Sequence, residues 1–505
     1  MITGNDLIKR GWKAGPAFGQ ALKRAHQVIA SGGSVEAALA AAGDPPEPPK
    51  TLALRADPIP LNEAVGTPVT NEEKENLISV REHMSRLLRV PVITGAAVMP
   101  DCCPAGSDPI VVGGAIAVKN AIIPAAHSSD ICCSMYASFF PPSRSQEEQM
   151  EILLKTTRFG QGGRPEEQWV DHPVIQRRDD RNPFLKGLDR YTRMHLADQG
   201  DGNHFAYLGK ISLTAELKAN LERVRHRGFA RALFEGAEGA SFLHVLVTHH
   251  GSRGLGAQVY KRGKNTAEEF ARKLCPETPK GTEWIPYETP EGQAYWEALR
   301  YIRDWTEVNH ELIHDRFLGQ LHGVQAGLQY FNAHNFVWQR GDTFFHGKGA
   351  TPAWKDAAGL PFLGLIPLNK ASPILLVAGN DNVQFLSFAP HGAGRNRSRT
   401  QTIRNFSSRE EMERAYQEAT KGLDVRWYSG KMDVAESPIG YKDATKIKNE
   451  IQEFGLATVL GEITPYGCIM AGEQPEPFWK AKKKIKKSCL DTRAKSGELD
   501  ESTEV

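Results

Sequence analysis

The chain has 505 residues, of which 40% are hydrophobic and 24% charged, as is usual for a globular protein. Its 62 basic and 60 acidic residues leave a net charge of +2, so any nucleic-acid site must be a local patch. Seven cysteines, two pairs of them adjacent, do not form a disulfide framework. No apolar run reaches the roughly 18 residues of a membrane span, and charged residues interrupt the N-terminus where a signal peptide would be apolar. The composition therefore favours a cytoplasmic protein with no membrane partner.

The N-terminal segment predicts a small helical module over residues 1–42, followed by a Pro-rich linker over residues 43–50. Its run Ile2-Thr3-Gly4-Asn5-Asp6-Leu7-Ile8, followed by Gly15-Pro16-Ala17-Phe18-Gly19, is similar to the C-terminal helical tail of bacterial CCA-adding tRNA nucleotidyltransferases. The resemblance implies a contact with RNA. A purely structural role for the module is the alternative.

Residues 51–478 read as one continuous body of mixed α and β structure. Apolar residues recur at three- and four-residue spacing from Gly292 to Gly323, which predicts a long helix. Helical patterns alternate with β-rich runs, namely Val90–Ala97, Ile110–Val118, Phe242–Thr248 and Ile374–Ala378. We therefore expect an α+β fold, a mixed α/β body with central β-sheets flanked by helices. Residues 479–505 read as a basic and then polar tail that is disordered.

Four short clusters carry residue types that bind metals. They are Ser129-Asp130-Ile131-Cys132-Cys133, Gly202-Asn203-His204-Phe205, His249-His250-Gly251-Ser252-Arg253 and Ala333-His334-Asn335-Phe336. A carboxylate and a thiolate three residues apart can converge on one cation, and mixed oxygen, sulfur and nitrogen donors suit manganese or zinc. A structural zinc site is disfavoured, because such sites use Cys and His pairs at short spacing. A single histidine such as His204 would otherwise be read more often as a core residue than as a ligand.

A fifth segment, Ser387-Phe388-Ala389-Pro390-His391-Gly392-Ala393-Gly394-Arg395, places one histidine among small residues. The backbone of such residues can approach a phosphate closely. A neutral imidazole is also a good nucleophile toward phosphorus. The arginines that follow, from Arg395 to Arg404, can neutralise phosphate charge, whereas the lysine-rich run over residues 480–487 reads as a solvated basic end. This segment therefore favours phosphoryl chemistry.

Taken in order, these segments resemble the RtcB-type RNA ligase family over residues 90–472. The family's Asp-Ile-Gly-Cys-Gly-Met motif corresponds to Asp130 and Cys133, while Cys132 and Ser134 replace glycines. The resemblance implies two bound manganese ions, with zinc or cobalt as alternatives, held by Asp130, Cys133, His204, His249 and His334. It implies His391 as the catalytic, nucleotidylated residue. It also implies nucleotide contacts from Asn203, His204, His334, Asn335, Pro367, His391, Gly392, Ala393, Gly394 and Tyr441, and RNA or phosphate contacts from Arg253, Arg395 and Arg399.

The resemblance further implies a reaction in RNA repair or tRNA splicing. His391 takes GMP from GTP, a 2′,3′-cyclic phosphate is opened, GMP passes to the RNA 3′-phosphate, and a 5′-hydroxyl seals the strand. The implied partners are RNA with broken ends, including tRNA, and an archease-like activator. Two alternatives stay open: a non-catalytic protein that binds RNA ends, and a metal-dependent RNA phosphodiesterase that needs no nucleotide.

Several positions depart from the family pattern around the nucleotide. Tyr207 stands where the family has a glutamate facing guanine, and Ala471 stands where it has a lysine. The loop Pro367-Leu368-Asn369-Lys370-Ala371 replaces Pro-Gly-Ser-Met-Gly, and Asp101-Cys102-Cys103 replaces Asp-x-His. Because hydrogen bonds to a base edge discriminate strongly, these changes predict an altered nucleotide preference, with ATP as the alternative to GTP.

Overall fold

The computed structural model describes residues 2–12, 16–45, 51–106, 109–225, 227–235, 237 and 239–473. The chain divides into two compact units, Met1–Ala53 with Lys273–Pro276, and Leu54–Arg272 with Glu277–Val505. The predicted linker lies partly outside the described residues, and the predicted tail lies wholly outside them. The boundaries predicted for the domains therefore stay predictions.

In the described part of the first unit, residues 2–45 form the helices α1 (Gly4–Lys9), α2 (Pro16–Ala30) and α3 (Val35–Ala42). Side chains that include Ile2, Leu7 and Trp12 form its small buried core. Ser34 caps α3, because its side chain accepts a hydrogen bond from the N–H of Ala37. These residues make a helical body of their own.

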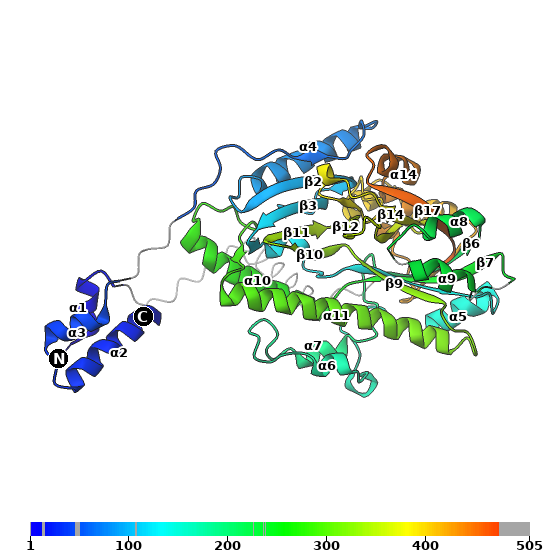
Figure 1. Ribbon diagram of the computed structural model, residues 1–505. Coiled ribbons are helices and arrows are strands. Elements are labelled where there is room, and N and C mark those ends of the chain that lie inside the picture. Colours follow the sequence, from blue (N-terminus) through cyan, green and yellow to red (C-terminus); the bar gives the residue numbers. More distant parts are fainter. Residues whose placement is uncertain are drawn as a thin grey trace, which may run out of the picture. The chain divides into compact units, whose positions relative to one another are not determined.

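The second unit is built around two large sheets (Figure 1). The five-stranded sheet has the order β1 (Asn62–Glu63), β2 (Ile93–Cys103), β3 (Val112–Lys119), β11 (Thr343–Lys348) and β10 (Asn335–Arg340). The eight-stranded sheet has the order β13 (Leu363–Pro367), β14 (Ile374–Gly379), β17 (Ala457–Met470), β6 (Phe205–Ser212), β7 (Phe242–His250), β5 (Ser134–Phe140) and β9 (Leu328–Ala333), with β16 (Asp424–Trp427) paired to β17. Two small pairs join β12 (Ala350–Pro352) to β15 (Phe388–Pro390) and β4 (Ala121–Ile122) to β8 (Ile285–Pro286).

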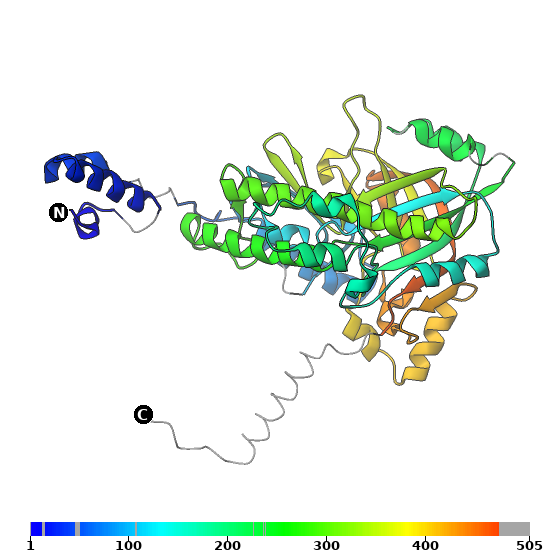
Figure 2. The same ribbon diagram turned by 90° about the horizontal axis from the view of Figure 1, so that it is seen from below.

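Helices pack around these sheets. The longest helix of the described residues, α11 (Pro290–Gly319), packs on β5 and β7. It lies beside α10 (Arg253–Leu274), as the two long green helices in Figure 2 show. Thr289 caps α11 at its start, where Pro290 occupies the first position. The other helices of this unit are α4 (Asn71–Leu87), α5 (Gln146–Thr156), α6 (Pro173–Gln176), α7 (Asp189–Met194), α8 (Ala215–Leu221), α9 (Arg227–Glu235), α12 (Arg399–Arg404), α13 (Arg409–Ala419) and α14 (Ala444–Glu453).

The mixed α and β fold predicted from the sequence is confirmed. The predicted helix over 292–323 corresponds to α11, which starts two residues earlier and ends four residues earlier. The predicted strand over 90–97 starts three residues late, at Ile93, because residues 90–92 form a turn. Among the described residues, none of the helices is long and apolar enough to cross a lipid bilayer.

Candidate active site

Most of the candidate ligands lie where strands of the eight-stranded sheet begin or end, on the same side of the sheet. Cys133 directly precedes β5, His204 directly precedes β6, and His249 lies at the end of β7. His334 links β9 to β10, and so joins this sheet to the five-stranded one. Because β6, β7, β5 and β9 are antiparallel neighbours in that order, the start of one strand lies next to the end of the following one. These four residues therefore lie close together.

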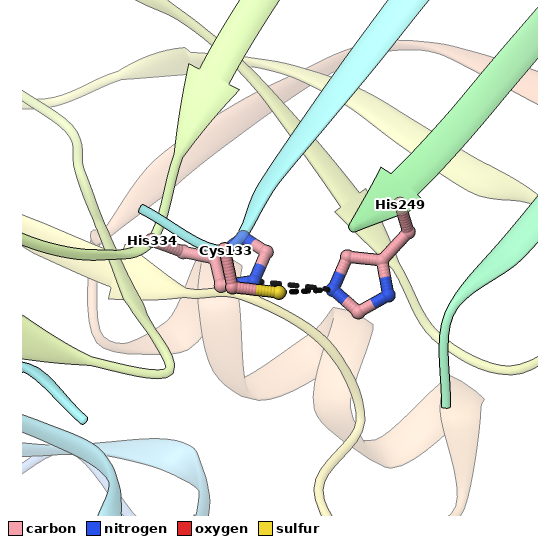
Figure 3. A group of neighbouring side chains, drawn as sticks. All are labelled: Cys133, His249 and His334. Carbon is pink, nitrogen blue, oxygen red and sulfur yellow. Dashed lines mark hydrogen bonds between the residues drawn. The ribbon is translucent and has the colours of Figure 1, made fainter. Parts of the chain in front are cut away.

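The first group of ligand-type side chains consists of Cys133, His249 and His334, all of them buried. The Nε2 atom of His249 lies 3.2 Å from the Sγ atom of Cys133 and 3.2 Å from the Nε2 atom of His334 (Figure 3). The Nδ1 atom of His334 is buried and has no hydrogen-bond partner within the described residues. Three ligand-type atoms this close fit a shared cation.

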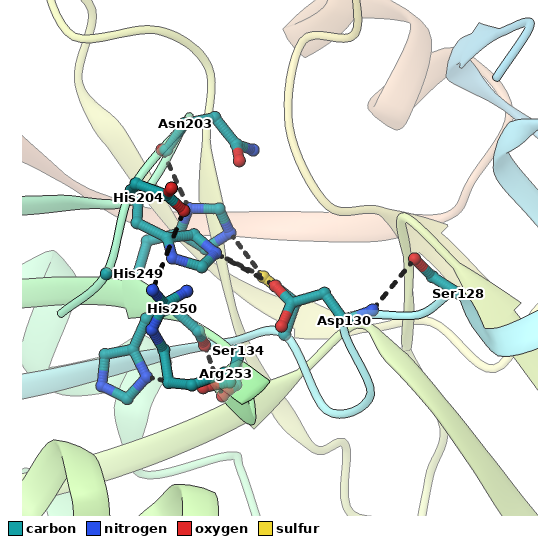
Figure 4. Close-up of polar contacts among 12 residues, drawn as sticks. Ser128, Asp130, Ser134, Asn203, His204, His249, His250 and Arg253 are labelled. Atoms are coloured by element: carbon teal, nitrogen blue, oxygen red, sulfur yellow. Dashed lines mark hydrogen bonds and ion pairs between the residues drawn. The ribbon is translucent and has the colours of Figure 1, made fainter. Parts of the chain in front are cut away.

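The second group consists of Asp130, Cys133 and His204. The Nε2 atom of His204 lies 3.0 Å from Oδ2 of Asp130 and 3.9 Å from Sγ of Cys133 (Figure 4). Gly251 makes room for this carboxylate, since a Cβ atom at that position would overlap the oxygens of Asp130. Cys133 belongs to both groups, so its sulfur is placed to bridge two cations.

Backbone carbonyls orient two of the imidazole rings. The Nδ1 atom of His204 lies 3.1 Å from the carbonyl oxygen of Gln199, and that of His249 lies 3.3 Å from the carbonyl oxygen of Asn203. A ring that donates its Nδ1–H to a carbonyl keeps a lone pair on Nε2. Each ring therefore presents its ligand-type nitrogen to the cluster.

Burial sets the protonation of these groups. It lowers the pKa of His249 to about 3 and that of His334 well below its ordinary value, so both imidazoles are neutral at pH 7. Burial acts to raise the pKa of Asp130, but the hydrogen bond and charge of His204 outweigh it and hold that pKa at about 2. Burial and the nearby Asp130 raise the pKa of Cys133 well above its ordinary value. A carboxylate, a thiol and imidazole rings form a ligand set that fits manganese or zinc, and either cation would stabilise the thiolate form of Cys133.

His391 follows the short strand β15 and lies next to this cluster, with its ring centroid 4.8 Å from that of His334. Its Nδ1 atom lies 2.7 Å from Oδ2 of Asp101, a fully buried carboxylate on β2. Gly349 permits this placement, because a Cβ atom there would lie 2.9 Å from the His391 ring. Since Asp101 engages Nδ1, Nε2 is the nitrogen left to act as a nucleophile.

A cavity of about 310 Å³ opens beside His391. Most residues predicted to contact nucleotide line it: Asn203, Asn335, Pro367, His391, Gly392, Ala393, Gly394 and Tyr441. The remaining two, His204 and His334, lie in the ligand cluster instead. The cavity therefore connects the candidate nucleophile with a volume that suits a small ligand.

The three arginines predicted to bind RNA or phosphate differ in their placement. Arg395 and Arg399 line the cavity. An Nη2 atom of Arg399 lies 2.7 Å from Oε1 of Glu436, and Arg395 donates to the carbonyl of Ala435 at 2.8 Å. Arg253 does not line the cavity; its guanidinium lies 3.8 Å from Asp201, next to the His204 loop.

Sequence reasoning did not assign a role to Asp101. The sequence does mark Asp101 as unusual, because it is the only charged residue between Val90 and Cys103, a run that otherwise reads as a buried strand. Nothing in the sequence, however, indicates that Asp101 contacts His391, which lies 290 residues further along the chain. Lys370 and Glu436 also line the cavity without having been predicted to do so.

These features define a candidate metal-dependent phosphoryl-transfer site, with a histidine between a cation-ligand cluster and a cavity. Residues 147–471 match the model of the family described as "tRNA-splicing ligase RtcB", and the chain belongs to this family. The resemblance stated from the motifs is thereby confirmed. The matched range contains His204, His249, His334 and His391, and it begins after Asp130 and Cys133.

Individual relatives support the same grouping. The chain is 30% identical over 297 residues to "RNA-splicing ligase RtcB" of Mycobacterium tuberculosis, a match that covers 54% of this chain and 64% of the relative. It is 29% identical over 300 residues to "tRNA-splicing ligase RtcB" of Aeropyrum pernix and 25% identical over 301 residues to that of Thermococcus kodakarensis. Each of those two matches covers 54% of this chain and 58% of the relative. The matches thus span less than two thirds of these relatives.

Proposed function

We propose that this protein is a metal- and nucleotide-dependent RNA ligase. It joins an RNA 3′-phosphate or 2′,3′-cyclic phosphate end to a 5′-hydroxyl end through a nucleotide bound covalently to His391. Membership of the RtcB family supports this proposal, as do the names of the relatives, which describe RNA- and tRNA-splicing ligases. Its substrates would accordingly be broken RNA strands, including tRNA halves.

The contact between Asp101 and His391 is the observation that carries the proposal. At 2.7 Å the buried carboxylate can hold the proton on Nδ1 and orient the ring. The Nε2 atom makes no hydrogen bond within the described residues and belongs to a side chain that lines the cavity. A ring oriented in this way beside a cavity can act as a nucleophile, which supports the proposed role of His391.

In the first step, Nε2 of His391 attacks the α-phosphorus of a nucleoside triphosphate. A P–N bond forms, the bond to pyrophosphate breaks, and the ring gains a positive charge. Asp101, whose carboxylate is fully buried, stabilises that charge through Nδ1–H. The phosphoramidate therefore forms beside a fixed counter-charge.

In the second step, an oxygen of the RNA 3′-phosphate attacks the same phosphorus and His391 leaves as neutral imidazole. A 2′,3′-cyclic phosphate must first be opened by water. The 5′-hydroxyl of the other strand then attacks the RNA phosphorus, and the nucleoside monophosphate departs. Charge on these phosphates can be met by Arg395 and Arg399, which line the cavity beside His391.

Asp130, Cys133, His204, His249 and His334 would hold the cations. A bound divalent cation supplies positive charge that stabilises phosphate oxygens during displacement. Manganese is the ion that we propose, with zinc or cobalt as alternatives, since the same donors accept all three. The sulfur shared between the two ligand groups supports a site for two ions.

The finer points of the proposal rest on the family resemblance. GTP is the nucleotide that it implies, with ATP as the alternative, and an archease-like protein is the activator that it implies. The cytoplasmic location rests on the sequence composition.

A joining assay tests the proposal. The manganese-loaded protein is incubated with GTP and two RNA oligonucleotides, one ending in a 3′-phosphate and the other starting with a labelled 5′-hydroxyl. We expect a product of the summed length that forms with the wild type and not with His391→Ala. Cleavage without nucleotide would instead identify a phosphodiesterase, and RNA binding without joining would identify an end-binding protein.

A further inference from the structure

The cavity has a second end, which the chemistry at His391 does not use. Phe205 and Tyr207 on β6 face Met470 and Cys468 on β17, and all four side chains line the cavity. Phe205 lies beside His249, with ring centroids 5.2 Å apart. Two residues along a strand span about 7 Å, so Tyr207 and Cys468 lie that much farther from the ligand cluster.

Lys370 lies at this far end. It lines the cavity, and its charge acts on the buried Cys468, the cross-strand partner of Tyr207. Its Nζ atom lies 4.8 Å from the ring centroid of Trp427 and 5.1 Å from that of Tyr416. These rings stabilise an ammonium group without accepting a full hydrogen bond from it.

The Lys370 ammonium is left without a hydrogen-bond partner. Its Nζ atom is buried, and no acceptor in the described part of the chain reaches it. A buried, unpaired ammonium is unfavourable, and burial accordingly lowers its pKa to about 8. Such a group on a cavity wall points to a ligand that supplies the acceptor.

Two side chains that line this part of the cavity have their oxygens engaged, whereas the buried hydroxyl of Tyr416 has no hydrogen-bond partner in the described part of the chain. The hydroxyl of Tyr207 donates to the carbonyl of Ile463 at 2.9 Å. The carboxylate of Glu436 lies 2.7 Å from Arg399 and accepts from the hydroxyl of Tyr441 at 2.9 Å. Asp433, whose charge also acts on Lys370, accepts from the N–H of Ala435 at 3.0 Å and does not line the cavity. Glu436 is the one acidic side chain among the described residues that line the cavity, and it is paired, so this end of the cavity offers a cationic donor and no free carboxylate.

We propose that Lys370 determines the nucleotide specificity of this pocket by donating to a carbonyl oxygen on the base. The inference rests on the proposed function, because it assumes that the α-phosphate lies at His391 and the base at the far end. Guanine and hypoxanthine present O6 as an acceptor there, whereas adenine presents an amino group, which is also a donor. With no free carboxylate to read the 2-amino group, the pocket treats guanine and hypoxanthine alike.

Calorimetric titration of the manganese-loaded full chain with GTP, ITP and ATP tests this assignment, in a His391→Ala background that prevents turnover. We expect GTP and ITP to bind within about threefold of each other and ATP about 10- to 100-fold more weakly. Lys370→Met should remove this preference, and Lys370→Arg should retain it. Lys421→Met is the matched control, since that lysine is exposed and its ion-pair partner among the described residues is Glu418.

Each other result has a defined meaning. Equal binding of ATP and GTP by the protein with Lys370 would overturn the assignment. Equally weakened binding of all three nucleotides in Lys370→Met would also overturn it, because such a loss would indicate that Lys370 contacts phosphate and not the base. ITP binding tenfold weaker than GTP would overturn the claim that no acceptor reads the 2-amino group. A GTP preference in the calorimetry, together with no covalent label when the protein that retains His391 is incubated with α-labelled GTP, would contradict the proposed ligase reaction and leave the Lys370 assignment standing.

Discussion

The carboxylate of Asp101 lies 2.7 Å from Nδ1 of His391, although the two residues are 290 positions apart in the chain. The contact joins β2 of the five-stranded sheet to the segment after β15. It gives the imidazole a fixed orientation and a counter-charge. The proposed nucleotidyl transfer depends on this contact.

Asp101→Asn tests the role of that charge. The amide keeps the shape but cannot stabilise an imidazolium ring, so we expect nucleotidylation of His391 to slow by about 100-fold or more. The rate is measured with radiolabelled nucleotide in a single turnover. Asp342→Asn, a change at an exposed carboxylate, is the control. A variant of Asp101 with the wild-type rate would refute the role assigned to this residue.

Cys133→Ala tests the shared sulfur, with Cys132→Ala as its neighbour control. Both thiols are buried, but Cys132 packs in the apolar core formed with α11. We expect Cys133→Ala to weaken the binding of both cations by at least about 10-fold and Cys132→Ala to leave metal content unchanged. Metal content and affinity are measured after reconstitution. Two ions bound with normal affinity in Cys133→Ala would contradict the bridging assignment.

His249 and His250 form a second matched pair. The Nε2 atom of His249 faces Cys133, whereas the ring of His250 stacks on that of His310 with centroids 3.4 Å apart. Replacing His249 with asparagine should therefore reduce metal binding. Replacing His250 with asparagine should retain the metal and destabilise the fold by about 1–3 kcal/mol, because it disturbs a buried polar stack. Metal loss in the His250 variant alone would reverse the assignment.

Lys370→Met should stabilise the protein in the absence of nucleotide. The pKa of Lys370 is about 8 in the folded state and 10.5 in the unfolded reference. Below pH 8 both states carry the charge and the folded state bears its full burial penalty, of about 1–3 kcal/mol. Between pH 8 and 10.5 the unfolded state binds more protons, so wild-type stability rises. The advantage of the variant, measured by denaturant unfolding, should be largest at pH 7 and shrink toward pH 10.5.

Groups around Lys370 set the size of that effect. The charges of Cys468, Glu436 and Asp433 raise its pKa, while that of Arg395 lowers it. A difference between variant and wild type that stays constant from pH 7 to 10.5 would show that the ammonium is solvated and paired in solution.

The sequence predicted the fold class and the family, since both depend on local periodicity and on short motifs. The long helix was predictable because Leu299, Ile302 and Trp305 repeat at helical spacing. The start of β2 was not predictable, because the turn at residues 90–92 is as apolar as the strand that follows it. The roles of the ligand residues were implied by motif register and stay predictions.

Contacts across the chain were beyond reach of the sequence alone. The pairing of Asp101 with His391 depends on how β2 and β15 are brought together. In the sequence, Lys370 is visible only as a departure from a family motif, because its neighbours in the chain do not predict the contact with the rings of Tyr416 and Trp427. Tertiary packing, rather than local pattern, decides which polar groups face the cavity.

The most direct test of the central claim is covalent labelling of His391. The manganese-loaded protein is incubated with α-labelled GTP and, separately, with ATP, and is then analysed on a denaturing gel after acid or alkali treatment. The account predicts a label from GTP that is acid-labile, alkali-stable and absent in His391→Ala. No label from either nucleotide with folded, metal-loaded protein, or a label that persists in His391→Ala, would contradict it.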